Sequence, residues 1–212
     1  MLQGLATGVM LAGANYVAVW VLHSKDALTL LFVALIAPAL FCAPLWGVIA
    51  RRIGKERGFV FASMLFGVAA LALTAMLWAP GSWVYLPVAL AGAGYAGMQS
   101  LPMAMLPDVI SHDAATHGDG QAGTFSGVWT AGETIGMALG ATALTLMLAI
   151  TGYTESVGTA SVVQGEAAVA GIVLSFSLVP AVLVLLSLAF IRRYPLRRGD
   201  IDTDAAAAAV LR

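Results

Sequence analysis

The sequence predicts an all-α membrane protein with six transmembrane helices, because it is strongly apolar and its apolar residues form long runs. Of its 212 residues, 60% are hydrophobic and only 10% are charged, whereas soluble domains carry roughly 25% charged residues. Each of six apolar runs reaches the roughly 20 residues that a helix needs to cross a bilayer. The predicted spans are Leu2–Leu22, Leu28–Ala50, Phe59–Ala79, Trp83–Leu106, Phe125–Ile150 and Ala167–Ile191.

The distribution of basic residues predicts which side of the membrane each connection faces. When the gaps between spans are assigned alternately to the two sides, Lys25 stands alone on one side. An excess of Lys and Arg marks the cytoplasmic side of a membrane protein. We therefore expect a multi-pass protein of the cell membrane with both termini in the cytoplasm. The basic residues on the predicted cytoplasmic side are Arg51, Arg52, Lys55, Arg57, Arg192, Arg193, Arg197, Arg198 and Arg212.

The connections between the predicted spans differ in length and composition. Short turns at His23–Ala27 and Pro80–Ser82 make antiparallel hairpins of the first two spans and of the next two. The third connection is a basic segment at Arg51–Gly58, where two glycines favour a break between helices. The remaining two are a polar segment without Lys or Arg at Pro107–Thr124 and a Ser/Thr/Gly segment at Gly152–Glu166.

The two ends of the chain carry separate expectations. Residues 1–198 are predicted to form one transmembrane domain, and residues 199–212 a cytoplasmic tail that is frayed or disordered. The first span lacks a basic leader and a small-residue cleavage site, so a signal peptide is not indicated. That span begins almost at Met1 without a polar segment before it. We interpret this beginning as typical of a piece of a longer protein.

Composition and motifs exclude several classes of function. The net charge of −1 gives no indication of nucleic-acid binding, and the single Cys42 can form neither an intrachain disulfide nor a thiolate metal site by itself. No metalloprotease, P-loop or hydrolase motif occurs, so we expect neither an enzyme nor a cofactor. His112 and His117 lie near three aspartates, but their spacing fits no metal-ligand motif, and a solvated loop is the favoured interpretation.

Glycines recur along several predicted spans. Gly132, Gly136 and Gly140 share one stripe of the fifth span, and Gly4 and Gly8 share one of the first. Small residues at this spacing let membrane helices approach closely. The first interpretation is packing alone. The second is that such stripes let helices bend and slide, as a transporter with alternating access requires.

Glu133 is the ionisable residue that lies well inside a predicted span. Counted from Phe125 at 1.5 Å per residue, it lies about 12 Å into the membrane. A buried carboxylate is costly unless it is paired, protonated or in contact with water. One interpretation is a proton or cation site, or a partner for a polar solute. The other is a protonated acid that forms a hydrogen bond between helices.

Other polar residues could share a cavity with Glu133. On the same helix, Trp129 and Thr130 are spaced four and three residues before it, so the three lie on one face. An aromatic ring together with amides and hydroxyls suits a sugar, which presents apolar ring faces and hydroxyl edges. Each residue alone is also compatible with a simple interhelical hydrogen bond. The predicted substrate-binding residues are Asn15, Tyr16, Gln99, Trp129, Thr130 and Glu133.

Two regions resemble one known family. Residues 101–113 read L-P-M-A-M-L-P-D-V-I-S-H-D, and residues 123–130 read G-T-F-S-G-V-W-T. Together with Pro44-Leu-Trp-Gly47 and Arg51-Arg-Ile-Gly54-Lys55, they resemble the glycoside–pentoside–hexuronide:cation symporters. This is the melibiose-permease branch of the major facilitator superfamily. The resemblance implies that the six spans are equivalent to helices 7–12 of that fold, and that Asp108 and Asp113 belong to its motif loop.

The chain also departs from the family pattern. Residues 117–123 lack the basic run of the family, and Thr134 stands where many members carry an intramembrane lysine. Thr130 matches a threonine near the sugar, whereas Gln99 replaces an aromatic residue. The cation-binding carboxylates of the family belong to its first six helices. The resemblance therefore implies a sugar as substrate without locating a cation site here.

Three functions remain open at this stage. The first is the C-terminal half of a secondary active transporter for a sugar or related small polar solute, in symport with Na⁺ or H⁺. Such a half lines only one wall of a cavity, so it needs the missing N-terminal six-helix half or a second copy as its partner. The second is a non-transporting membrane protein that acts as a structural or regulatory partner of another membrane protein. The third is an inactive remnant of a truncated gene.

Overall fold

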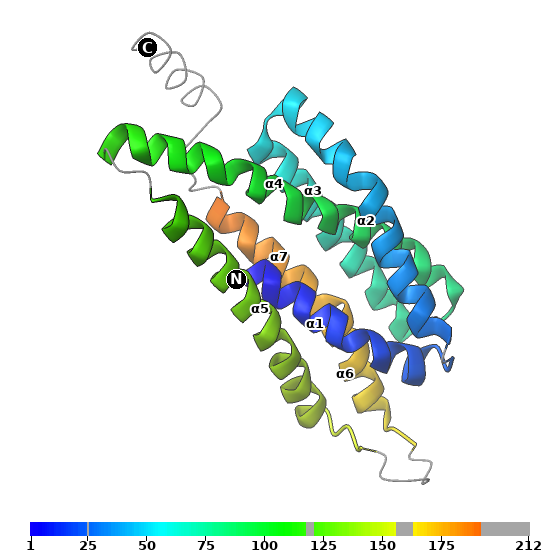
Figure 1. The fold of residues 1–212 in the computed structure, drawn as a ribbon. Helices are drawn as coiled ribbons and strands as arrows, with labels where there is room; N and C mark the ends of the chain where they lie inside the picture. Colours follow the sequence, from blue (N-terminus) through cyan, green and yellow to red (C-terminus); the bar gives the residue numbers. More distant parts are fainter. Residues whose placement is uncertain (25, 118–120, 156–162, 192–212) are drawn as a thin grey trace.

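The computed structural model describes residues 1–24, 26–117, 121–155 and 163–191, and every regular element within them is a helix. The helices form one elongated bundle, in which α1 and α7 lie side by side near the centre (Figure 1). The helices are α1 (Leu2–Tyr16), η1 (Val17–Val21), α2 (Asp26–Ile53), α3 (Lys55–Ala72), η2 (Leu73–Leu77), η3 (Ser82–Val84), α4 (Tyr85–His117), α5 (Ala122–Ile150), α6 (Glu166–Phe176) and α7 (Leu178–Ile191).

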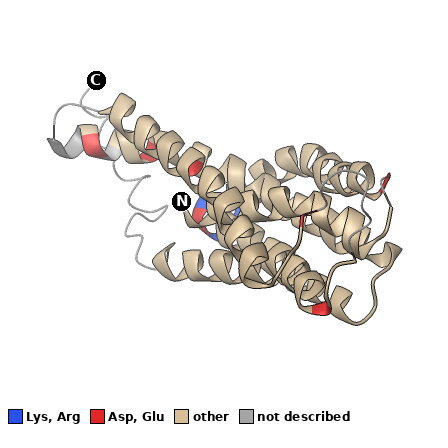
Figure 2. Cartoon of the chain, turned by 90° about the horizontal axis from the view of Figure 1, so that it is seen from below, with Lys and Arg blue, Asp and Glu red and all other residues tan. Residues whose placement is uncertain are grey.

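Five helical stretches among the described residues are long and apolar enough to cross a membrane. Each coincides with one of the predicted spans, and charged residues are sparse along the ribbon (Figure 2). The fourth predicted span corresponds to α4, which is not one of the five, because Gly, Pro, Gln and Ser residues lower its hydropathy. The five stretches are Leu2–Val21, Asp26–Ile53, Lys55–Leu77, Ala122–Ile150 and Glu166–Ile191.

The polar connection predicted from Pro107 is wrong over most of its length. Instead of ending near Leu106, α4 continues through Pro107 to His117. Proline removes one backbone donor, but its fixed φ is compatible with a helix, and the bundle tolerates the lost hydrogen bond. Polar composition indicated a loop here, although Asp, Ser, His and Ala can all continue a helix that leaves the apolar region.

The last predicted span is divided into two helices. Helix α6 ends at Phe176 and α7 begins at Leu178, with Ser177 between them. The break is explained by Pro180, which has no N–H to donate to the carbonyl of Phe176 four residues earlier. The carbonyl oxygen of Val173 accepts both the Ser177 hydroxyl at 2.7 Å and the Ser177 backbone N–H at 3.0 Å.

The glycine stripes of α1 and α5 face each other. A Cβ atom on Gly140 would lie 2.5 Å from the carbonyl carbon of Gly8, and one on Gly8 would lie 2.5 Å from the carbonyl oxygen of Met137. Gly4 likewise meets Glu133, so the two helices run parallel in close contact. This geometry is what the packing interpretation predicted, since any side chain would separate the two backbones.

Helix α4 is packed in the same way against α2 and α3. A Cβ atom on Gly92 would collide with the carbonyl group of Leu35 in α2, and one on Gly94 with Ala62 and Phe66 in α3. The Trp46 indole of α2 donates to the carbonyl oxygen of Ala93 at 2.7 Å. Helices α2, α3 and α4 therefore form one tightly packed group, beside the group built around α1.

The helices differ greatly in how much of their surface the chain itself covers. In the most apolar 18-residue stretch of each, 61% of α1–η1 is buried, but only 22% of α5 and 6% of α2. The α2 face carries Leu40 and Phe41, which are 70% and 76% exposed. Helices α2 and α5 are therefore the outermost members of the bundle and present their apolar faces to the surroundings.

Candidate solute-binding cavity

A cavity of about 660 Å³ lies among five helices and is lined by apolar side chains together with several polar ones. Helix α1 contributes its first turn, α4 and α5 contribute polar side chains from within their lengths, and α3 and α7 complete the wall. Three of the six predicted substrate-binding residues line this cavity together, namely Gln99, Trp129 and Glu133.

A hydrogen-bonded chain of three side chains connects α4 and α5. The Gln99 amide donates to the Glu133 carboxylate at 2.5 Å and lies 2.9 Å from the Tyr95 hydroxyl. Tyr95 and Gln99 are spaced four residues apart on α4, so they share one face of the helix. Glu133 therefore lines the cavity with one carboxylate oxygen hydrogen-bonded to the Gln99 amide. Because this donor is uncharged, it positions the carboxyl group of Glu133 without supplying an opposite charge.

A second polar centre forms around Gln3 of α1. Its amide donates to the hydroxyl oxygens of Ser63 in α3 and Ser187 in α7, both at 3.1 Å. Three helices that are distant in the sequence therefore meet at one side chain. The sequence analysis missed Gln3 and Ser187 as lining residues. Gln3 offered a signal, since it is an amide inside a predicted span, whereas Ser187 is common enough in membrane helices to give none.

Trp129 lines this cavity, but its indole Nε1 atom is buried within the protein and has no hydrogen-bond partner. A buried N–H without an acceptor costs free energy, on the order of 1–3 kcal/mol.

The other three predicted substrate-binding residues do not join the cavity. Thr130 is exposed on α5 and does not line it. Asn15 is exposed near the far end of α1, and Tyr16 packs edge-on against Tyr153 with ring centroids 5.3 Å apart. Twelve residues of helix separate Gln3 from Asn15, about 18 Å at 1.5 Å per residue. The expectation of a single cluster from the first, fourth and fifth spans is therefore wrong for Asn15 and Tyr16.

Tyr16 instead belongs to an aromatic cluster at the opposite end of the bundle. The indole of Trp20 donates to the Tyr153 hydroxyl at 3.2 Å, and their rings meet at 80°. Trp20 lies in η1, a π-helical turn that continues α1. Edge-to-face aromatic pairs of this kind stabilise packing. Here they hold the start of the α5–α6 connection against the end of α1.

The predicted motif loop is helical, and its first aspartate forms an ion pair. Asp108 lies in α4, and its carboxylate oxygen is 2.6 Å from the Lys55 ammonium nitrogen. Lys55 opens α3 directly after Gly54, whose φ of +95° lets the chain reverse in one residue. Asp113 lies further along α4 and is half-buried. The pair connects the basic α2–α3 turn to the extended end of α4.

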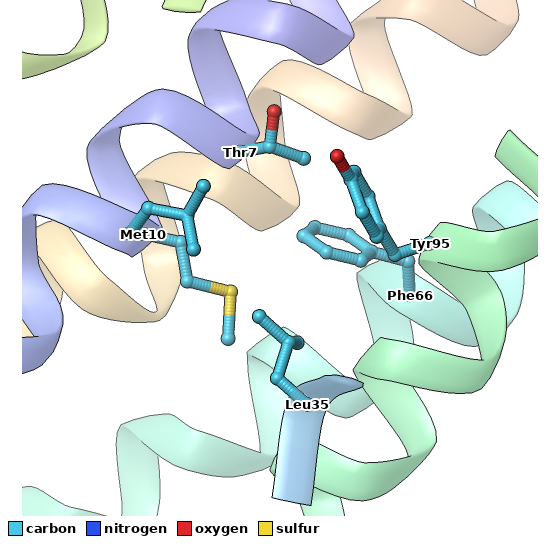
Figure 3. Close-up of a pocket in the computed structure, with 6 residues that line it drawn as sticks. Thr7, Met10, Leu35, Phe66 and Tyr95 are labelled. Atoms are coloured by element: carbon cyan, nitrogen blue, oxygen red, sulfur yellow. The ribbon is translucent and has the colours of Figure 1, made fainter. Parts of the chain in front are cut away.

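A much smaller cavity lies behind Tyr95. It holds about 20 Å³, lined by Thr7, Met10, Leu11, Leu35, Phe66 and Tyr95. Figure 3 shows Met10 and Leu35 on the side of it away from the hydroxyl groups of Thr7 and Tyr95. The volume accommodates roughly one water molecule. This small cavity lies between α1 and α4, beside the Tyr95 side chain that contacts the Gln99 amide.

Among the side chains that the structure describes, no group of three or more His, Cys, Asp or Glu residues could hold a metal ion. The side chains of His112 and His117, for which a solvated loop was expected, lie outside the described residues.

Apolar helices of membrane-spanning length around a polar cavity define a multi-pass helical membrane protein with the general plan of a solute transporter. The family model described as "MFS/sugar transport protein" matches residues 1–198. Because this match covers almost the whole chain, the protein belongs to that family, whose members are transporters. No curated protein matches the chain. The resemblance seen in the sequence is confirmed at the level of the major facilitator superfamily.

Proposed function

We propose that the chain is the C-terminal half of a secondary active transporter that moves a sugar or related small polar solute in symport with Na⁺ or H⁺. On this proposal the chain crosses the cell membrane six times, with α4 as the fourth span and both termini in the cytoplasm. The observation that carries the proposal is the cavity in which Gln99, Trp129 and Glu133 meet.

The chemistry of this cavity supports solute binding. Polar and ionisable groups are costly inside a membrane and mark solute or ion pathways when they face a cavity. Here amide, carboxylate, hydroxyl and indole groups line one space between apolar helices. They offer both donors and acceptors, as the hydroxyl groups of a sugar require. Part of the wall is formed by aromatic rings, which suit the apolar faces of a sugar ring.

The exposed face of α5 supports a partner for this half. Thr130, Thr134 and Thr145 are exposed on α5, on the side opposite to its glycine stripe. Interfaces between membrane helices are enriched in small residues and in Ser and Thr, whereas a lipid-facing surface favours large apolar side chains. We propose that the N-terminal six-helix half, or a second copy of the chain, covers this face.

The directions of the helices agree with the proposed topology. Helices α1 and α5 run parallel. The first and fifth spans of a chain that crosses the membrane six times must run in the same direction. The basic residues Arg51, Arg52 and Lys55 surround the α2–α3 turn. The excess of basic residues favours a cytoplasmic position for this turn.

Uptake measured with and without the partner half tests the proposal. We expect proteoliposomes that hold this chain alone to show no concentrative sugar uptake, because the cavity then lacks its second wall. Proteoliposomes that hold the chain joined to an N-terminal six-helix half should accumulate a labelled sugar when a Na⁺ or H⁺ gradient is applied. Cross-linking of the chain alone detects a homodimer, which would supply the second wall instead. Accumulation of the sugar that depends on neither the Na⁺ gradient nor the H⁺ gradient would exclude symport.

A further inference from the structure

We infer that this cavity selects a hydroxylated solute that carries a protonated amine, such as an amino sugar, over a neutral or acidic sugar. The inference rests on the proposed function, and it specifies the substrate class of the same cavity. It follows from the charge of the lining residues, from their aromatic rings and from their amide and hydroxyl groups.

Among the residues that the structure describes, those that line the cavity include one acid and no basic side chain. Glu133 is that acid, and Gln99 is its only hydrogen-bond partner among the described residues. The α-amino group of Met1 is the only other ionisable group of a lining residue, and it forms no ion pair with Glu133. Gln99 occupies one carboxylate oxygen, so the second oxygen remains available to an ammonium group of a solute. An acidic solute would be repelled, since charges interact strongly in a medium of low dielectric constant.

Aromatic side chains surround the same space. Phe59 of α3, Trp129 of α5 and Phe190 of α7 all line the cavity. A cation over the face of an aromatic ring is stabilised by the ring quadrupole, most strongly by tryptophan. A carboxylate combined with three rings is therefore suited to an organic cation.

The polar lining residues other than Glu133 favour a solute that also carries hydroxyl groups. Gln3 and Ser187 line the cavity together with Gln99. Amide and hydroxyl groups offer both donors and acceptors, which hydroxyl groups of a solute can match. The solute that suits Glu133 and these side chains therefore carries hydroxyl groups as well as a protonated amine.

The test measures thermal unfolding of the purified full chain in lipid nanodiscs with glucosamine, glucose and glucuronate. We expect glucosamine to stabilise the chain at a concentration roughly tenfold or more below that of glucose, as a charge-assisted hydrogen bond implies. Glucuronate should have the weakest effect. Glu133→Gln should reduce the affinity for glucosamine to that for glucose. Glu166→Gln, which removes an acid from the first turn of α6, should leave the preference unchanged.

Each other outcome has a defined meaning. Equal stabilisation by glucose and glucosamine in the native chain would overturn the inference but leave the proposed sugar transport intact. If no sugar alters unfolding, either of the chain alone or of the chain joined to an N-terminal six-helix half, the inference is overturned, whereas gradient-driven sugar uptake by the joined protein would still support the proposed function. Stabilisation by NaCl alone that depends on Glu133 would assign this carboxylate to the coupling ion and overturn the inference. An N-terminally extended chain, in which Met1 carries no charge, should favour glucosamine even more strongly.

Discussion

At the scale of single residues, the cavity combines groups that stabilise the fold with groups that the fold leaves unsatisfied. Gln3 is bonded to two serine hydroxyls and Gln99 to a tyrosine and a glutamate. In contrast, the indole N–H of Trp129 is buried without a partner. Trp129 therefore contributes to the cavity as an aromatic side chain, while the polar contacts to a solute fall to the amide, hydroxyl and carboxylate groups of the other lining residues.

Replacement of Trp129 by phenylalanine should separate the buried indole N–H from the aromatic ring. Trp129→Phe removes the unsatisfied donor and keeps an aromatic ring, so the free energy of unfolding without solute should be unchanged or higher by up to about 1 kcal/mol. Solute-induced stabilisation should persist, because an aromatic ring still lines the cavity. Thermal unfolding in nanodiscs, with and without sugar, measures both effects. Loss of solute-induced stabilisation in this variant would show instead that the indole N–H reaches the solute.

Substitutions of Glu133 should distinguish an ionisable role from packing. In the transporter formed with its partner half, Glu133→Gln should reduce transport much more than Glu133→Asp, because glutamine keeps the size but cannot exchange a proton. Membrane insertion should stay normal, since the amide relieves the cost of burying an acid. Initial rates of uptake between about pH 5 and 8 measure the effect. Unchanged rates across this range for Glu133→Gln would leave helix packing as its only role.

At the scale of helices, backbone contact between α1 and α5 determines how the cavity is closed. Gly8 and Gly140 allow the two backbones to touch, and Gly4 brings the first turn of α1 against Glu133. Because lipid tails are as apolar as the helices, the hydrophobic effect does not hold helices together within a membrane. Close contact of this kind stabilises the pair through van der Waals packing instead. The opposite face of α5 makes no such contact, because an added Cβ atom at Gly127 meets nothing within 4 Å.

Two glycines of α5 provide a matched pair for testing this packing. Gly140→Ala places a methyl group against the backbone of Gly8, so the free energy of unfolding should fall by about 1–3 kcal/mol or more. Gly127→Ala fills open space and should be neutral or slightly stabilising, because alanine favours helix over glycine. Thermal or denaturant unfolding of both variants in the same lipid gives the comparison. Equal effects at the two positions would contradict the contact between α1 and α5.

At the scale of the whole molecule, the charge distribution and the positions of the aromatic residues both favour the proposed topology. The basic α2–α3 turn is joined by the Lys55–Asp108 ion pair to the extended end of α4. The aromatic cluster of Trp20 and Tyr153 lies at the other end of the bundle. Cytoplasmic basic residues and interfacial aromatic residues are both usual features of membrane proteins.

Reporter fusions test this topology. Fusions after Arg57 and Gln121 should report a cytoplasmic position, and fusions after Ser24, Ser82 and Gln164 an external one, because basic segments stay in the cytoplasm. A pair of reporters active on opposite sides of the membrane checks each position twice. A cytoplasmic signal after Gln164 would contradict six spans, since the α5–α6 connection would then lie on the same side as the α2–α3 turn.

The sequence predicted the cavity only in part. Glu133 and Trp129 were recognised because an acid and an aromatic residue at helical spacing are unusual within a span, and Gln99 because it is an amide. The structure places all three along one cavity. Asn15 has the same chemical character, yet it is exposed far from the cavity. Residue type indicates which side chains need partners, but not the depth and rotation at which neighbouring helices bring them together.

By itself, the sequence determined the class of protein and the positions of its apolar helices. A chain in lipid must satisfy its backbone hydrogen bonds internally, so long apolar runs become helices whatever their neighbours are. Only the tertiary structure decided that α4 continues to His117 and that Gln3 joins three helices. These features depend on contacts between segments as far as 184 residues apart. Such contacts are set by the close approach of whole helices, which local patterns do not encode.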